Sequence, residues 1–123
     1  MKSGRVLLVD DEPDHLEVLK ALLDDEFDVV TAVSVAHALD ALDRHDFHVV
    51  VSDFNMPGGS GLDVLRYALE LDVIVTGLLL TGCPEQAAAA GGPNVRVISK
   101  AMAPDRIVAV VRAAVTDVVG ERG

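Results

Sequence analysis

The chain has 123 residues, a length that fits one domain, and half of them are hydrophobic, so a sizeable core can be buried. A net charge of −10 argues against direct nucleic-acid binding, and no apolar run reaches the roughly 18 residues that a membrane span requires. A single cysteine excludes an internal disulfide and suits a reducing compartment, so we expect a cytoplasmic protein.

The first third of the chain predicts two strands and two helices. The apolar run RVLLV at 5–9 is typical of a strand that is buried on both faces. Pro13 suits the first turn of a helix, and 28–32 (DVVTA) predicts the next strand. Ser34 is a capping residue for a second helix over 35–45. The leucines of the first helix recur at helical spacing: Leu16, Leu19, Leu22 and Leu23.

The middle of the chain continues the alternation. A third strand is predicted at 47–52 (FHVVVS), and a capping box that starts at Ser60 opens a helix over 61–71. A fourth strand is predicted at 77–81 (GLLLT). Residues 73–76 (VIVT) either extend this strand or belong to a loop, because their periodicity favours neither.

The last third predicts a short helix, a strand and a long helix. The short helix covers 84–90 (PEQAAAA), and the fifth strand covers 95–99 (VRVIS). Pro104 opens the last helix, and we expect 119–123 to form a tail or the start of a linker. The last helix has an apolar stripe that should face the core: Ile107, Val108, Val111, Ala114, Val115 and Val118.

Strands and helices therefore alternate five times. This order predicts an α/β fold in which helices cover both faces of a parallel sheet. We expect a flavodoxin-like, doubly wound arrangement of five strands in the order 2-1-3-4-5, with five helices. The whole chain, 1–123, is read as one domain whose core covers about 4–118.

Polar residues follow four of the five predicted strands. In an open parallel sheet, ligands bind beyond the carboxyl ends of the strands, so these side chains should meet at one edge. Carboxylates that meet there repel one another strongly, and Mg²⁺ is a cation that prefers oxygen ligands. The residues in question are Asp10, Asp11 and Glu12 after the first strand, Asp53 after the third, Thr81 after the fourth, and Ser99 and Lys100 after the fifth.

A divalent cation, a lysine, a hydroxyl and a free carboxylate together indicate phosphoryl transfer. The cation and Lys100 would neutralise charge on the phosphoryl oxygens. Asp53 would be the nucleophile and become an aspartyl-phosphate, and Thr81 would donate a hydrogen bond to a phosphoryl oxygen.

Four segments, in this order, resemble the receiver domain of two-component response regulators, the CheY-like family. They are VLLVDDEPDHLEVL at 6–19, VVVSDFNMPGGSGLDVL at 49–65, LLLTG at 78–82 and VISK at 97–100. The resemblance extends over roughly residues 4–118, and the combination of all four segments is highly specific.

The resemblance implies a role for each matching residue. Asp53 would accept a phosphoryl group from a phosphohistidine of a sensor histidine kinase or a histidine phosphotransfer protein. Thr81 would be the switch hydroxyl, and Lys100 would pair with the phosphoryl group. Such a domain controls a partner protein or output domain and catalyses only its own phosphorylation and dephosphorylation. The implied Mg²⁺ ligands are Asp10, Asp11, Asp53 and the backbone carbonyl of Asn55.

The sequence departs from the family at two positions and in one spacing. Val97 stands where many receivers have an aromatic switch residue, so output through the usual face is in doubt. Ala101 follows Lys100 where proline is usual, and a cis bond there would cost about 2.5–4 kcal/mol, so we expect a trans bond. The interval from Thr81 to Lys100 is short, which predicts a short fourth helix.

Several alternatives stay open. Asp10, Asp11 or Glu12 also suits a helix cap. The chain could be a pseudo-receiver that acts as an interaction module without phosphorylation. A phosphohydrolase is disfavoured, because Asn55 stands where such enzymes need a second acid. We expect a monomer or a weak homodimer, for which Val118 and Val119 are candidate contacts. The four histidines, at 15, 37, 45 and 48, are interpreted as surface or boundary residues.

Overall fold

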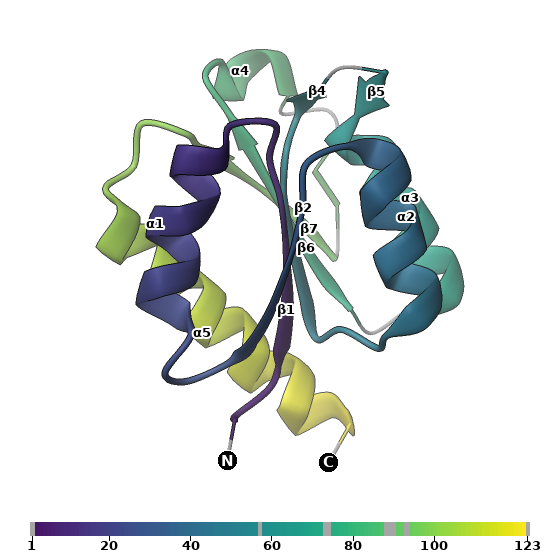
Figure 1. The fold of residues 1–123 in the computed structure, drawn as a ribbon, viewed down its shortest axis with the longest axis vertical. Helices are drawn as coiled ribbons and strands as arrows, with labels where there is room; N and C mark the ends of the chain where they lie inside the picture. Colours follow the sequence, from purple (N-terminus) through teal and green to yellow (C-terminus); the bar gives the residue numbers. More distant parts are fainter. Residues whose placement is uncertain (1, 57, 73–74, 88–90, 93, 123) are drawn as a thin grey trace.

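The computed structural model contains a parallel five-stranded sheet with helices on both faces (Figure 1). The structure describes residues 2–56, 58–72, 75–87, 91–92 and 94–122. In chain order the elements are β1 (Arg5–Val9), α1 (Pro13–Leu23), β2 (Asp28–Ala32), α2 (Val35–Arg44), β3 (Val49–Asp53), β4 (Asn55–Met56), β5 (Gly59–Ser60), α3 (Gly61–Leu71), β6 (Thr76–Thr81), α4 (Pro84–Ala87), β7 (Val95–Ser99) and α5 (Pro104–Arg122).

The order of the strands confirms the predicted topology. The sheet runs β2-β1-β3-β6-β7, with every neighbouring pair parallel. Counted along the chain, the five strands of this sheet stand in the order 2-1-3-4-5. Because all five are parallel, their carboxyl ends meet at one edge, which lies opposite the two termini in Figure 1.

Side chains alternate between two cores, one on each face of the sheet. In β1, Val6 and Leu8 belong to the core shared with α1 and α5, whereas Leu7 and Val9 belong to the core shared with α2 and α3. Figure 1 shows these two pairs of helices on opposite faces of the sheet. All four side chains are at most 2% exposed. Full burial of such a side chain contributes about 1.5–3 kcal/mol, so both layers hold the central strands in place.

The helical stripes are confirmed, with differences at their margins. Every residue of the predicted stripe on α5 is buried, but Leu22 of α1 is 46% exposed, while the other three leucines of its set face the core.

Helix α5 continues to Arg122 and so includes residues that we expected to form a tail. Val118 is buried in the core and is therefore unavailable for a dimer contact, whereas Val119 is 43% exposed.

Some boundaries differ from the prediction. β3 starts at Val49 and ends on Asp53, because Asp53 pairs with Leu80 of β6 and the N–H of Phe54 also donates to the Leu80 carbonyl at 2.8 Å. β6 begins at Thr76, one residue earlier than predicted. Residues 73–74, and 88–90 of the predicted fourth helix, lie outside the described residues.

Both predicted serine caps are present. Ser34 Oγ accepts a hydrogen bond from the N–H of His37 at 3.1 Å. Ser60 Oγ accepts from the N–H of Leu62 at 3.0 Å, and its own N–H donates to Asp63 at 3.2 Å. These bonds satisfy N–H groups that have no partner within the helix, and they begin α2 and α3 where the sequence predicts.

The turn after Asp53 is more regular than its glycines suggest. β4 and β5 form a small antiparallel hairpin, with Asn55 opposite Ser60. Gly58 has a φ of 80°, a conformation that a side chain makes costly.

None of the helices in the described part of the chain is both long and apolar enough to cross a membrane.

Candidate functional site

The carboxyl edge of the sheet gathers the polar residues that the sequence singled out. Asp10 directly follows β1, Asp53 ends β3, Thr81 ends β6 and Lys100 directly follows β7. Asp10, Asp53 and Thr81 are each at most 4% exposed. Buried polar groups are costly unless they are paired, so their gathering at this edge marks a site rather than ordinary surface.

Lys100 is the cation at the centre of this site. Its Nζ lies 2.7 Å from Asp53 Oδ2, 3.0 Å from Glu12 Oε1 and 3.8 Å from Asp10 Oδ2. The backbone N–H of Lys100 donates to the carbonyl of Thr81 at 2.8 Å, which continues the pairing of β6 and β7. The lysine therefore joins the ends of three strands through one ammonium group.

Four carboxylates form an acidic cluster around that lysine. One oxygen from each lies within 4.8 Å of the others. Asp53 Oδ1 is buried and has no hydrogen-bond partner among the described residues. Such an oxygen needs a cation or a donor to offset the cost of its burial, so the cluster fits a divalent cation held by oxygen ligands. The members of the acidic cluster are Asp10, Asp11, Glu12 and Asp53.

The buried ionisable groups of the site have shifted pKa values. Burial, with repulsion from Asp10, raises the pKa of Asp53 from 3.8 to about 7, although Lys100 opposes the shift. Burial alone would raise the pKa of Asp10 as well, but hydrogen bonds, first among them the one with His15, lower it. Burial would lower the pKa of Lys100, but Asp53 and Glu12 raise it, so the lysine stays charged.

The raised pKa of Asp53 predicts that the metal-free protein loses stability as the pH rises. Between 3.8 and about 7 the unfolded chain has released this proton, while the folded protein still holds it. The free energy of unfolding should therefore fall through this window and level off above it. Urea unfolding in EDTA at several pH values between about 5 and 8 measures this decrease in the free energy of unfolding.

The control for this prediction is a carboxylate outside the site. Asp53→Asn should remove most of the fall, because an amide does not ionise. Asp46→Asn changes an exposed carboxylate that precedes β3, and should keep the fall. An undiminished fall in Asp53→Asn would contradict the assignment of the pH dependence to Asp53.

Two further predicted residues lie at the same edge. Thr81 Oγ1 accepts a hydrogen bond from the N–H of Cys83 at 3.1 Å, so the hydroxyl proton remains available for another acceptor. Asn55 lies two residues beyond Asp53, in β4, with an exposed side chain. Pro57, between Asn55 and the following glycines, lies outside the described residues.

The sequence analysis placed Glu12 at this edge without a role, and the structure gives it one. Glu12 occupies the N-cap position of α1, but its side chain makes no capping hydrogen bond. Its carboxylate pairs instead with Lys100, which is 88 residues away in the chain. The run of three acids at 10–12 is a signal for this role, but the capping interpretation competed with it.

His15 is a residue of the site that the sequence analysis missed, because it was interpreted as a surface or boundary residue. Its ring is half-buried, and its Nδ1 lies 2.5 Å from Asp10 Oδ2. A histidine five residues after an aspartate has no spacing signature for such a contact. The contact depends on how α1 leaves β1, which the sequence pattern does not show.

The departures from the receiver pattern have simple structural outcomes. Val97 lies in β7, half-buried against the core on the α2 and α3 side, and offers only an aliphatic surface there. The bond between Lys100 and Ala101 is trans, as predicted, since the described residues contain no cis peptide bond. Helix α4 has four described residues, and the rest of the helix predicted at 84–90 lies outside the described residues.

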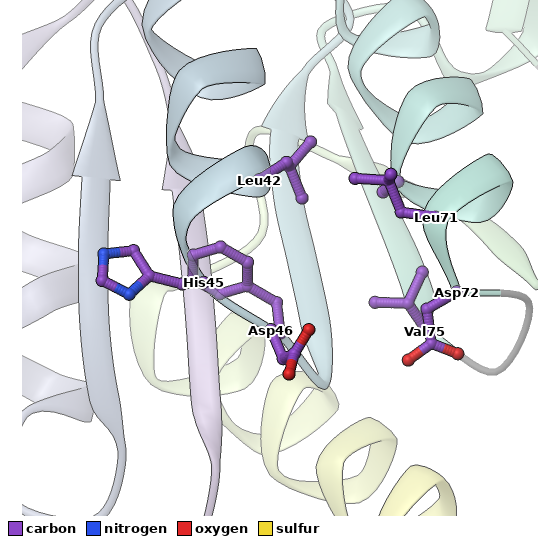
Figure 2. A pocket seen from close by; sticks show the side chains of 8 residues that line it. Leu42, His45, Asp46, Leu71, Asp72 and Val75 are labelled. Carbon is purple, nitrogen blue, oxygen red and sulfur yellow. The ribbon is translucent and has the colours of Figure 1, made fainter.

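A hollow also lies at the opposite end of the sheet (Figure 2). Leu42, Leu71 and Val75 gather around it, while the ring of His45 points away from them. Its volume is only about 30 Å³, so it is a small hollow. Because this end of the sheet lies opposite the acidic cluster, its side chains are suitable positions for control substitutions.

Comparisons with known proteins agree with this geometry. A family model described as "Response regulator receiver domain" matches residues 6–112. The hydrogenase transcriptional regulatory protein HoxA of Cupriavidus necator is 31% identical over 118 residues, which cover 93% of this chain and 24% of HoxA. The chain therefore spans about a quarter of the length of that relative.

Solved structures show the same fold. The "BeF3 Activated DrrB Receiver Domain" is 25% identical, with a TM-score of 0.79 over 94% of this chain and 99% of that one. A CheY-like receiver domain protein of Methanospirillum hungatei has a TM-score of 0.83 over 96% of this chain and 98% of its own, and at 21% identity it supports the fold alone. Together with the acidic cluster and Lys100, which form the typical phosphoacceptor pocket, these matches show that the chain belongs to the family of response regulator receiver domains.

Proposed function

We propose that Asp53 accepts a phosphoryl group from a phosphohistidine of a sensor histidine kinase or a histidine phosphotransfer protein. One observation supports this above all. The carboxylate of Asp53 is buried in the acidic cluster, with Oδ2 on Lys100 and Oδ1 without a hydrogen-bond partner among the described residues. A carboxylate that is rigid, partly uncompensated and next to a fixed cation is suited to nucleophilic attack.

We propose Mg²⁺ as the cation of the acidic cluster. Its ligands would be Asp10, Asp11, Asp53 and the backbone carbonyl of Asn55, since Mg²⁺ prefers oxygen ligands and keeps several waters. Bound there, it would supply positive charge to the phosphoryl oxygens and offset the repulsion among the carboxylates. The short separations among the carboxylate oxygens support this choice.

In the transfer step, a carboxylate oxygen of Asp53 attacks the phosphorus atom and forms an acyl-phosphate bond. The bond from phosphorus to the donor's imidazole nitrogen breaks, and its electron pair stays with the imidazole, which takes up a proton. The ammonium group of Lys100 moves from Glu12 to the phosphoryl oxygens and neutralises their charge. The Thr81 hydroxyl donates a hydrogen bond to one of these oxygens.

The movement of Thr81 and Lys100 would shift a two-state equilibrium of the domain. The phosphorylated state would then favour a partner protein or an output domain. We place this function in the cytoplasm, as a monomer or weak homodimer. Because Val97 replaces an aromatic ring, we expect the β7 face to change less than in receivers that have one.

A small phosphodonor tests the proposal directly. We expect the wild-type protein, incubated with acetyl phosphate and MgCl₂, to gain the mass of one phosphoryl group. The gain should be lost when EDTA replaces MgCl₂, because the charge of the transferred group is then uncompensated. Intact-mass spectrometry measures both reactions.

The same experiment, together with an assay of phosphate-ester hydrolysis, decides between the proposal and its alternatives. An unmodified wild-type protein in MgCl₂ would favour the pseudo-receiver, which acts as an interaction module without phosphorylation. Steady hydrolysis of a phosphate ester over many turnovers would favour a phosphohydrolase. Equal mass gain in EDTA would contradict the role of the cation.

A further inference from the structure

His15 is held against the acidic cluster by the geometry of α1. Pro13 begins this helix, and Leu16 and Leu19 anchor it in the core, at 6% and 2% exposure. His15 lies on the first turn with 18% of its side chain exposed, and its Nδ1 is 2.5 Å from Asp10 Oδ2. A packed helix therefore fixes the ring against the carboxylate.

The contact complements the other bonds of Asp10. Asp10 Oδ1 accepts the N–H of Glu12 at 2.9 Å, and Oδ2 faces Lys100 at 3.8 Å. An ionised carboxylate only accepts hydrogen bonds, so the Nδ1–H of His15 donates to Oδ2. The two N–H donors hold both oxygens of the group and leave it little rotational freedom.

His15 itself stands outside the group of mutually close ligand atoms. Among the described residues, that group consists of the four carboxylates of the acidic cluster. Asp53 Oδ1 is buried within the cluster without a hydrogen-bond partner, which independently indicates that a cation belongs there. Groups that hydrogen-bond a metal ligand orient it, and their loss typically weakens metal binding 10–100-fold.

We propose that His15 is a positioning residue that orients Asp10 for binding of the divalent cation. The inference rests on the proposed function, since it deepens the metal site of that function. The donor group, rather than the charge or volume of the ring, provides the effect. A side chain that offers an N–H at the same place should therefore preserve the affinity for the cation, whereas an apolar side chain should not.

Binding of Mn²⁺ tests this without any phosphorylation step. The electron paramagnetic resonance signal of free Mn²⁺ decreases on binding, so a titration at pH 8 gives the dissociation constant of each variant. His15→Leu should weaken binding about tenfold, by loss of the donor. His15→Asn should keep most of the affinity, because its amide nitrogen takes the place of Nδ1.

Controls separate positioning from stability. His45→Leu makes the same change in an exposed ring that points away from the hollow at the opposite end (Figure 2), and should bind Mn²⁺ like the wild type. Urea unfolding in EDTA shows that each variant folds, and His15→Ala replaces His15→Leu if the leucine variant does not.

Each result has a definite meaning. Equal affinity in the wild type and His15→Leu overturns the inference, even if His15→Leu is less stable. Equal weakening in His15→Asn and His15→Leu also overturns it, because the donor would not suffice. A wild-type protein that binds no Mn²⁺ overturns the proposed function together with the inference, whereas Mn²⁺ binding with phosphorylation and no effect of His15→Leu overturns the inference alone.

Discussion

Asp53→Asn should abolish phosphorylation of the protein by acetyl phosphate. The amide has nearly the shape of the carboxylate but lacks an anionic oxygen that can attack phosphorus. Lys100 retains its ion pair with Glu12 at 3.0 Å, so the site should keep its arrangement. The variant is therefore expected to stay folded while its mass remains unchanged in the presence of MgCl₂.

The matched control is Asp46→Asn, which makes the same chemical change at an exposed position outside the acidic cluster. It should gain one phosphoryl group at the wild-type rate. Persistent labelling of Asp53→Asn would contradict the assignment of Asp53. Peptide mapping would then show whether Asp11 or Glu12, the exposed members of the acidic cluster, accepts the group instead.

Gly61→Ala should destabilise the fold severely and disturb the site. A Cβ at this position would lie 2.0 Å from the backbone oxygen of Asp53 and 2.8 Å from Ser52 Oγ. The backbones cannot separate freely, because the N–H of Gly61 donates to the Phe54 carbonyl at 2.8 Å. A clash with the backbone of Asp53 and the side chain of Ser52 should cost more than about 3 kcal/mol of unfolding free energy.

Urea unfolding measures this loss, and Gly120→Ala is its control. Nothing lies within 4 Å of a Cβ added at Gly120, which is in α5, so alanine there should stabilise the protein by about 0.5–1 kcal/mol. A loss below about 1 kcal/mol in Gly61→Ala would show that α3 can move away from β3 at little cost. Phosphorylation of the folded fraction should also slow, because the strained backbone carries Asp53.

The sequence by itself determined the order of the elements and the residues that meet at the carboxyl edge. Apolar runs such as 5–9 and the stripe of α5 are local patterns, set by the period of each element, and can be recognised without long-range contacts. The rule that parallel strands share one carboxyl edge then places Asp10, Asp53 and Lys100 together. The structure confirms that these three residues meet there.

Only the tertiary structure decided which neighbours those residues have. The pairing of Glu12 with Lys100 joins two ends of the chain, so the capping interpretation could not be excluded from local pattern. The donation from His15 to Asp10 depends on the angle at which α1 packs on the sheet. The last residue of β3 was likewise set by its pairing with β6, since strand ends depend on a partner strand that propensity does not describe.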